Sequence, residues 1–355
     1  MGMVNAVDIH QFLELAREHP VFDVRTPEEF EKGHIPGAYN LPLFSNEERA
    51  IVGTTYHRKG RQEAILAGLD LVGPKMPELV KRVKRLTKDN VVLLHCWRGG
   101  MRSNSVGWLL SLFDYEVYVL QGGYKAFRNF VLQTFEQPRK IVILSGQTGS
   151  GKTEVLQELR KMGEQVIDLE ALARHKGSSF GSLGETSQPT QQQFENTLAM
   201  EWLALDSNRP VWLEDESQKI GSRMIPQSLW LQMRNTHVLV LEVPLELRAE
   251  HLMKEYGAFP KSLLIDSISR IQERLGGLHT RKAIELVETD QLRACCELLL
   301  SHYYDKAYRH GLSKRHPELI HRIPTDTINP TENAKKVLEA ARRLEREWET
   351  STMHS

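Results

Sequence analysis

Residues 141–159, IVILSGQTGSGKTEVLQEL, restrict the possible folds of this chain more than any other segment. An apolar run leads directly into a Gly-x4-Gly-Lys-Thr loop, and a helical pattern follows. In such a loop the backbone N–H groups surround phosphates, the lysine reaches the outer phosphates, and the threonine hydroxyl can ligate magnesium. The segment therefore predicts a phosphate-binding P-loop between a strand and a helix of an α/β sheet. The predicted phosphate-binding residues are Gly146, Gly149, Ser150, Gly151, Lys152 and Thr153.

Further strands are expected after this loop, at 166–169, 210–213 and 238–243. The strand at 210–213 runs into Glu214-Asp215-Glu216, where a P-loop protein usually keeps an acidic residue for magnesium or for an acid–base step. We choose Asp215 as the acidic partner of the loop, although the sequence does not distinguish the three carboxylates. No complete set of metal ligands is assigned.

The first third of the chain alternates strand and helix patterns. Asp8 can cap a helix whose apolar residues follow helical spacing, and strands are expected at 21–24, 91–95 and 117–120. A helix is expected at about 103–113. Alternation of this kind predicts a parallel sheet that is covered on both faces, with reactive groups at the carboxyl ends of the strands.

The loop HCWRGGMRS at 95–103 places Cys96 at such a strand end. Backbone N–H groups, the two arginines Arg98 and Arg102, and the following helix N-terminus would favour the thiolate. Gly99 and Gly100 allow consecutive amides to point inward as an anion-binding nest. The alternative is that Cys96 is a buried core residue with a packing role only. The surrounding residues favour a sulfur nucleophile that attacks or carries an anionic group.

Composition excludes several classes of protein. The chain of 355 residues has 46 basic and 46 acidic residues, so nucleic-acid binding would need local basic patches, of which several occur. Its three cysteines cannot form a disulfide framework, and the adjacent Cys295 and Cys296 are best explained as core residues. Because the cysteines are few and the N-terminus lacks the apolar region of a secretory leader, we expect a protein of the reducing cytoplasm. No membrane span is expected either, since no apolar run approaches the roughly 18 residues that a span needs.

From about residue 260 the pattern becomes helical, with mixed charge and amphipathic spacing. A polar, proline-containing break at 136–139 separates the first third from the P-loop segment. The predicted organisation is therefore a first domain at 1–138, a P-loop α/β domain at 139–258 and a helical C-terminal subdomain at 259–355.

Three segments of the first domain resemble the rhodanese family: FDVRTPEEFEKGHIPGAYNLP at 22–42, the Cys96 loop, and VYVLQGGYKAF at 117–127. The resemblance implies a rhodanese-like parallel sheet whose loop cysteine carries a persulfide or a related chalcogen. One feature departs from the common sulfurtransferases, because five residues rather than four separate Cys96 from Arg102. A loop of this length also resembles the rhodanese-fold phosphatases.

Three motifs follow one another along the chain: GTTYHRKGRQEAI at 53–65, CWRGGMRS at 96–103 and GQTGSGKT at 146–153. A rhodanese-like domain that is fused to a P-loop domain and carries these motifs resembles the tRNA 2-selenouridine synthases. This resemblance implies a two-step exchange at the wobble uridine of the tRNAs for lysine, glutamate and glutamine. The 2-thio sulfur is first alkylated by geranyl diphosphate, and selenium from selenophosphate then displaces the S-geranyl group.

The same resemblance implies roles for the residues named above. Cys96 would carry the selenium, and Arg98, Arg102 and the amides around Gly99 and Gly100 would hold the phosphate of selenophosphate. The P-loop would hold the diphosphate of the geranyl donor, with magnesium at Thr153. Selenophosphate synthetase is an expected partner, and no membrane partner is expected.

Two other functions remain open from the sequence. The Cys-x5-Arg spacing fits a rhodanese-type phosphatase that is fused to a nucleotide kinase. A nucleotide-switched RNA-binding module, whose first domain docks a sulfur carrier, is the alternative from a different class.

Overall fold

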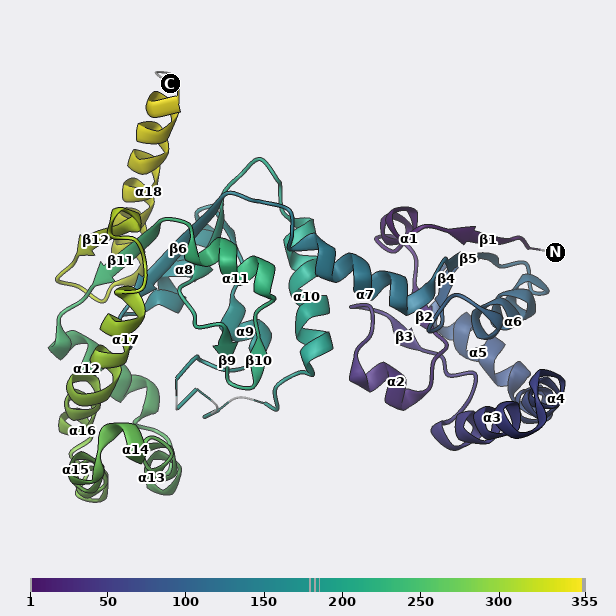
Figure 1. The fold of residues 1–355 in the computed structure, drawn as a ribbon, viewed down its shortest axis with the longest axis horizontal. Helices are drawn as coiled ribbons and strands as arrows, with labels where there is room; N and C mark the ends of the chain where they lie inside the picture. The colour runs from purple at the N-terminus through teal and green to yellow at the C-terminus, as the bar shows by residue number, and fades with distance from the viewer. Residues whose placement is uncertain (1, 179, 182, 185, 353–355) are drawn as a thin grey trace. The chain divides into compact units, whose positions relative to one another are not determined.

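The computed structural model describes residues 2–178, 180–181, 183–184 and 186–352. The chain divides into two compact units (Figure 1). The first contains the residues up to 134 together with 190–200, and the second contains 135–189 together with the residues from 201 onward. Each unit has a five-stranded sheet, and every strand pair in these two sheets is parallel, so the predicted α/β class is confirmed. The further division at residue 258 stays a prediction.

The sheet of the first unit has the strand order β1-β5-β4-β2-β3. The central strand β4 is flanked on both sides and is buried along most of its length, which explains its uninterrupted apolar sequence. The strands are β1 (Val4–Val7), β2 (Val21–Asp23), β3 (Tyr39–Asn40), β4 (Val91–His95) and β5 (Glu116–Leu120).

Several helices of the first unit begin at side-chain caps. Asp8 caps the first of them, as expected, and Thr26 and Ser45 each form a capping box with a glutamate three residues later. The helix expected at 103–113 begins two residues earlier and ends at Ser111. The helices are α1 (Ile9–Leu15), α2 (Pro27–Lys32), α3 (Asn46–Lys59), α4 (Arg61–Val72), η1 (Gly73–Lys75), α5 (Met76–Leu86), α6 (Met101–Ser111) and α7 (Gly123–Thr134).

One apolar core joins the sheet of the first unit to its helices. It includes Phe22 and Leu94 from the strands, Val83 from α5 and Leu110 from α6. This core holds β4 in the centre of the unit, so the residues at its carboxyl end are fixed from both sides. Residues 190–200, which include most of α10 (Gln191–Ala204), belong to this unit.

The sheet of the second unit has the strand order β12-β11-β6-β8-β7. The strand that precedes the P-loop, β6, lies between β11 and β8, so its carboxyl end is enclosed. The sheet strands are β6 (Ile141–Gly146), β7 (Gln165–Val166), β8 (Val211–Glu214), β11 (Val238–Glu242) and β12 (Ile320–Pro324). A separate antiparallel pair consists of β9 (Lys219–Ile220) and β10 (Arg223–Met224).

The strand β12 was not anticipated, because its sequence IHRIP lies in a region of helical patterns. It is an edge strand that pairs only with β11, and of its residues only Ile323 is buried. The last helix, α18 (Pro330–Thr352), follows it and packs its alanines and valine against α8 (Lys152–Lys161), the helix of the P-loop.

The remaining helices of the second unit confirm the predicted helical C-terminal region. Cys295 lies in the apolar core of these helices, and Cys296 packs beside a neighbouring cluster. Within the described residues, no helix combines the length and apolar character needed to cross a bilayer. The helices are α9 (Leu169–Ala173), α11 (Gln227–Arg234), α12 (Leu245–Tyr256), α13 (Lys261–Ser269), α14 (Gln272–Leu275), α15 (Gly277–Glu288), α16 (Leu292–Leu299), the π-helix η2 (Leu300–Tyr304), α17 (Asp305–Leu312) and η3 (Pro317–Leu319).

Candidate active sites

Cys96 lies at the carboxyl end of β4, in the loop that precedes α6, and is 4% exposed. The loop turns at Gly99 (φ 64°), where a Cβ would come within 2.4 Å of the Leu120 carbonyl oxygen. On the facing turn, a Cβ at Gly123 (φ 59°) would lie 2.4 Å from the Cys96 carbonyl oxygen. Glycine at both positions lets the two turns pack together, and the Tyr124 N–H donates to the Cys96 carbonyl oxygen at 2.8 Å.

The sulfur of Cys96 accepts hydrogen bonds from the Gly100 N–H and from the Ser103 hydroxyl, each at 3.3 Å. Burial is the largest influence and by itself raises the pKa of the thiol. The hydrogen bonds from Ser103, Arg98 and Gly100 outweigh burial, so the pKa of Cys96 lies below its ordinary value. The loop therefore favours the thiolate, which is the nucleophilic form.

The two arginines of the loop lie in different surroundings. Arg98 is exposed, whereas the Arg102 guanidinium donates to both carboxylate oxygens of Glu29 on α2, at 2.7 and 3.2 Å. Burial raises the pKa of Glu29, but the Arg102 partner outweighs it and the net pKa is lowered. Glu29 was missed in the sequence because its spacing from Thr26 signals only a helix start. The anion-binding roles of Arg98, Arg102, Gly99 and Gly100 stay predictions.

A buried polar network lies beneath this loop. The carboxylate of Asp23, at the end of β2, accepts from the Arg25 Nε at 2.9 Å, and the Arg25 guanidinium lies 3.7 Å from the centre of the Tyr124 ring. The Tyr124 hydroxyl accepts from the Asn196 amide at 2.9 Å. All four side chains are buried. Because Tyr124 also bonds the Cys96 carbonyl, this network fixes the turn on which the cysteine loop rests.

The predicted P-loop follows β6 and leads into α8. Its turn has two glycines of positive φ, Gly149 (81°) and Gly151 (75°), and a Cβ at Gly149 would lie 2.8 Å from the Arg248 carbonyl oxygen. The Ser150 side chain is buried inside the loop, and Lys152 begins the helix. The loop borders a cavity of about 980 Å³, which is large enough for a phosphate ester. The lining includes the predicted residues Gly146, Gly149, Ser150, Gly151, Lys152 and Thr153.

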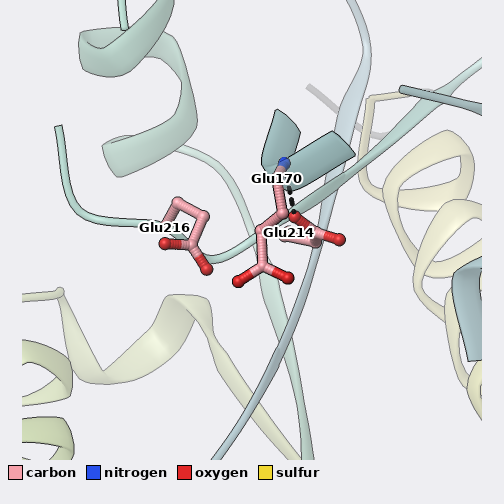
Figure 2. Close-up of side chains that lie close together, drawn as sticks. All are labelled: Glu170, Glu214 and Glu216. Atoms are coloured by element: carbon pink, nitrogen blue, oxygen red, sulfur yellow. Dashed lines mark hydrogen bonds between the residues drawn. The ribbon is translucent and has the colours of Figure 1, made fainter. Parts of the chain in front are cut away.

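Three carboxylates converge beside the P-loop: Glu170 from α9, Glu214 at the end of β8 and Glu216 just beyond it (Figure 2). One ligand atom of each lies within 4.8 Å of the others. The Glu170 N–H donates to a Glu214 oxygen at 3.4 Å, and the Thr153 hydroxyl donates to Glu170 at 3.4 Å. Burial and the charge of Glu170 raise the pKa of Glu216 to about 8. Burial also raises the pKa of Glu214 well above its usual range.

This cluster fits a divalent cation. Hard cations such as Mg²⁺ prefer oxygen ligands, and a cation would relieve the mutual repulsion of the three carboxylates. The Oε1 atom of Glu214 is buried and has no hydrogen-bond partner among the described residues, as a free ligand atom would. Thr153, the residue predicted to ligate magnesium, already contacts the cluster through Glu170. Sequence reasoning missed Glu170 because it lies outside the acidic run at 214–216.

Asp215, which we chose from the sequence, also lines the P-loop cavity, but its carboxylate has protein partners. The Arg315 guanidinium donates to it at 2.6 Å, and the Ser145 hydroxyl donates at 2.7 Å. The structure thus brings Glu214 and Glu216 together with Glu170 and directs Asp215 to a buried arginine. A role for Asp215 as the acidic partner of the P-loop stays a prediction.

A second, apolar cavity adjoins the P-loop cavity in the same unit. The two cavities share lining residues, among them Thr148, Leu252, Tyr256 and Tyr304. Burial raises the pKa of Cys295 to about 12 and that of Cys296 to about 11, so both thiols are neutral. The remaining apolar lining comes from Phe180, Met253, Leu264, Ile268, Val287, Leu292, Cys295, Cys296 and Leu299.

A thiolate loop on one parallel sheet and a phosphate-binding loop on another define a rhodanese-like domain joined to a P-loop domain. The sequence profiles agree: residues 8–130 match the rhodanese-like domain, and residues 139–337 match the tRNA 2-selenouridine synthase AAA domain. The chain belongs to the tRNA 2-selenouridine synthase family. It is therefore an enzyme of tRNA modification.

Similar proteins support this assignment along almost the whole chain. The tRNA 2-selenouridine synthase of Shewanella piezotolerans is 35% identical over 90% of this chain and 95% of its own length. The synthase of Shewanella loihica is 36% identical over 86% of this chain and 90% of its own length. The synthase of Proteus mirabilis is 35% identical over 86% of this chain and 92% of its own length.

Proposed function

We propose that this enzyme replaces the 2-thio sulfur of a wobble uridine by selenium in two steps. In the first step, C1 of geranyl diphosphate bonds to the uridine sulfur, diphosphate leaves with the electron pair, and the uridine loses its N3 proton. In the second step, selenium displaces the S-geranyl group at C2. The S-geranyl uridine, hydrogen selenophosphate and water give 2-selenouridine, geranylthiol and phosphate, with no net oxidation or reduction.

The main support for the first step, the geranylation, is that two cavities adjoin in the second unit. A geranyl diphosphate has a charged head and an apolar tail, so it needs a phosphate cradle next to an apolar chamber. The P-loop cavity meets the first requirement. The adjoining cavity near Cys295 and Leu299 is apolar but only about 50 Å³, so it would have to widen to admit the whole tail. Lys152 and the loop amides would hold the diphosphate and stabilise the charge that develops as it leaves. On this proposal the P-loop need not hydrolyse a nucleotide.

Magnesium would be held by Glu170, Glu214 and Glu216 with Thr153 beside them, and when bound it would supply positive charge next to the diphosphate. Without it, the three carboxylates would repel the same diphosphate. Lys152 and the backbone amides of the P-loop, which line the cavity, would contact the diphosphate directly.

The second step is assigned to the first unit. Cys96 would act as the nucleophile toward selenophosphate, because its thiolate is favoured by Gly100 and Ser103. The thiolate would attack phosphorus, hydrogen selenide would leave with the electron pair and attack C2, and water would then release phosphate from the S-phosphocysteine. Arg98, together with the amides at Gly99 and Gly100, would hold the phosphate end, and Arg102 would join them if it exchanged Glu29 for the substrate. Phosphate held over a cysteine would also account for the lengthened loop.

The proposed substrates are the tRNAs for lysine, glutamate and glutamine, and selenophosphate synthetase would supply the selenium donor. We place the reaction in the cytoplasm, where a reactive thiol such as Cys96 stays reduced.

Nucleoside mass spectrometry of thiolated tRNA tests the proposal with two variants. With both co-substrates present, Cys96→Ala should stop at S-geranyl-2-thiouridine, and Lys152→Ala should leave 2-thiouridine unchanged. Lys152→Ala should still convert tRNA that has been geranylated beforehand. If both variants lose both steps equally, the assignment of one step to each unit is wrong. Cleavage of a phosphate ester without any uridine product would favour the phosphatase alternative.

A further inference from the structure

The hairpin of α3 and α4 contributes unusually little to the core of the first unit. The two helices lie side by side (Figure 1), and α3 buries none of its 14 residues. Of the residues of α4, only Ala64, Gly68 and Val72 are buried. A helix of a globular domain normally buries an apolar stripe, whereas α3 contributes only the partly buried Val52 to the core, so packing explains little of its sequence. Its segment GTTYHRKGRQEAI also has no role in either proposed step.

The tip of this hairpin is exposed and basic. Arg58 and Lys59 end α3, and Arg61 begins α4 after Gly60, which has a φ of 87°. All three cations are exposed, and none has a hydrogen bond or an ion pair to another described residue. Some other exposed cations of this unit do have partners, such as Lys32 with Glu28 at 2.6 Å.

Helix stability does not account for these charges. A cation in the last turn of a helix is favourable, but Arg61 stands at the first position of α4, where the helix dipole disfavours a positive charge. No side-chain cap offsets this, because the N-cap of α4 is Gly60. Tyr56, one turn before the end of α3, is 54% exposed and leaves a large aromatic ring in solvent. Cations with an exposed ring are the side chains that bind RNA phosphates and stack on unpaired bases.

The base of the hairpin is linked to the cysteine loop by two contacts. The Arg102 guanidinium binds Glu29 in the first turn of α2, and the neighbouring Glu28 N–H donates to the Asn46 side chain at 3.1 Å. Asn46 is the first residue of α3. The tip lies one helix length away, about 21 Å for 14 residues at 1.5 Å per residue. An RNA whose base reaches Cys96 therefore has its backbone within range of the hairpin.

The other basic surface of this unit, on α5, is less suited to binding the RNA. Arg85 is already paired with Glu78 at 2.7 Å, and the Lys84 ammonium lies over the Phe113 ring. The helix α5 ends just before β4 begins, so these charges approach the amino end of the strand whose carboxyl end is followed by Cys96. The exposed Lys81 and Arg82 on this helix therefore provide a matched control.

We propose that the tip of the α3–α4 hairpin binds the backbone of the tRNA substrate. Arg58, Lys59 and Arg61 contact phosphates, and Tyr56 stacks on an unpaired base. This inference rests on the proposed function only in taking tRNA as the macromolecular substrate. It names the surface that holds the RNA while its uridine is presented to the cysteine loop.

The test is equilibrium binding of a transcribed tRNA for lysine to the full chain across a salt series. The triple variant Arg58→Ala, Lys59→Ala, Arg61→Ala should bind on the order of tenfold or more weakly, and the slope of log affinity against log salt should fall in magnitude by about 2 to 3. The control variant Lys81→Ala, Arg82→Ala should bind as the wild-type chain does. All the altered side chains are exposed, so the circular dichroism spectrum should be unchanged.

If the triple variant and the wild-type chain have the same affinity and the same salt dependence of affinity, the inference is wrong. The hairpin would then be a candidate surface for a protein partner. Equal losses in the triple and control variants would also overturn it, because binding would then follow net charge alone. A failure of the proposed function would give a different result, because the wild-type chain would then bind tRNA but yield neither geranylated nor selenium-bearing uridine.

Discussion

Folding alters the charge state of the carboxylates beside the P-loop. Glu170 and the pair Glu214 and Glu216 come from two segments of the chain, and their negative charges oppose one another in a buried setting. A pKa of about 8 for Glu216 means that this group binds a proton near neutral pH in the absence of a cation. Cation binding and proton release should therefore be coupled at this site.

This coupling gives a pH-dependent prediction. A carboxyl group whose pKa is about 8 when folded and 4.5 as a model group holds more protons in the native state between those values, so its contribution to stability falls as the pH rises from about 4.5 to 8. With a chelator present, the melting temperature should fall across this range, and Mg²⁺ should reduce the fall. Thermal unfolding by circular dichroism measures both.

Glu216→Gln should flatten the pH dependence, whereas Glu246→Gln, which alters the first turn of α12 in the same unit, should leave it unchanged. A pH profile of stability that is identical in the wild-type chain and in Glu216→Gln would show that Glu216 does not titrate in this range.

At the scale of elements, the cysteine loop depends on the turn that follows β5. Gly123 and Gly99 approach each other so closely that a Cβ on Gly123 would lie 2.4 Å from the Gly99 nitrogen. Gly100, one residue further along, has open space where its Cβ would be. Gly99 is thus required by the close approach of the two turns, whereas Gly100 is not, although the two glycines are adjacent in the sequence.

Gly123→Ala should therefore disturb the loop and Gly100→Ala should not. The first change places a Cβ in contact with backbone atoms at a φ of 59° and should cost on the order of 2 kcal/mol or more in unfolding free energy, with loss of the Cys96-dependent step. The second keeps its N–H bond to the Cys96 sulfur and should change the rate less than a few-fold. Denaturant unfolding and nucleoside mass spectrometry measure the two effects. Similar rates for both variants would contradict this account.

At the scale of the whole molecule, each unit has its own parallel sheet, core and candidate site. The cysteine loop lies at the end of β4 in the first unit, and the P-loop lies at the end of β6 in the second. This arrangement suits a reaction whose two steps use different donors, because each donor meets a separate set of residues.

Ligand protection should follow the same division. In hydrogen–deuterium exchange, Mg²⁺ with inorganic diphosphate should slow exchange at residues 146–153 and near Glu170, since a ligand that binds only the native state stabilises the segments that hold it. Amides at 96–103 should be unaffected, and Lys152→Ala should abolish the effect. Protection of the cysteine loop by diphosphate would contradict the assignment of that ligand to the P-loop.

Local motifs determined the parts of this protein that depend on neighbours in the chain. The P-loop, the strand before Cys96 and the cap at Asp8 were predictable because each is specified within a few residues. The resemblance of several motifs in one chain also predicted the family, which the profile matches confirm. The strand β12 was not predictable, because an edge strand with His, Arg and Pro has little apolar pattern of its own.

Only the tertiary structure decided how distant side chains meet. Glu170 joins Glu214 because α9 begins where β8 ends, at the same edge of the sheet. Asp215 turns instead toward Arg315, 100 residues away in sequence. Glu29 meets Arg102 for the same reason. Packing between elements determines which of these side chains become partners, and no residue spacing along the chain encodes the pairing. The sequence by itself determined which chemical groups are present and which loops carry them, and folding determined which of those groups act together.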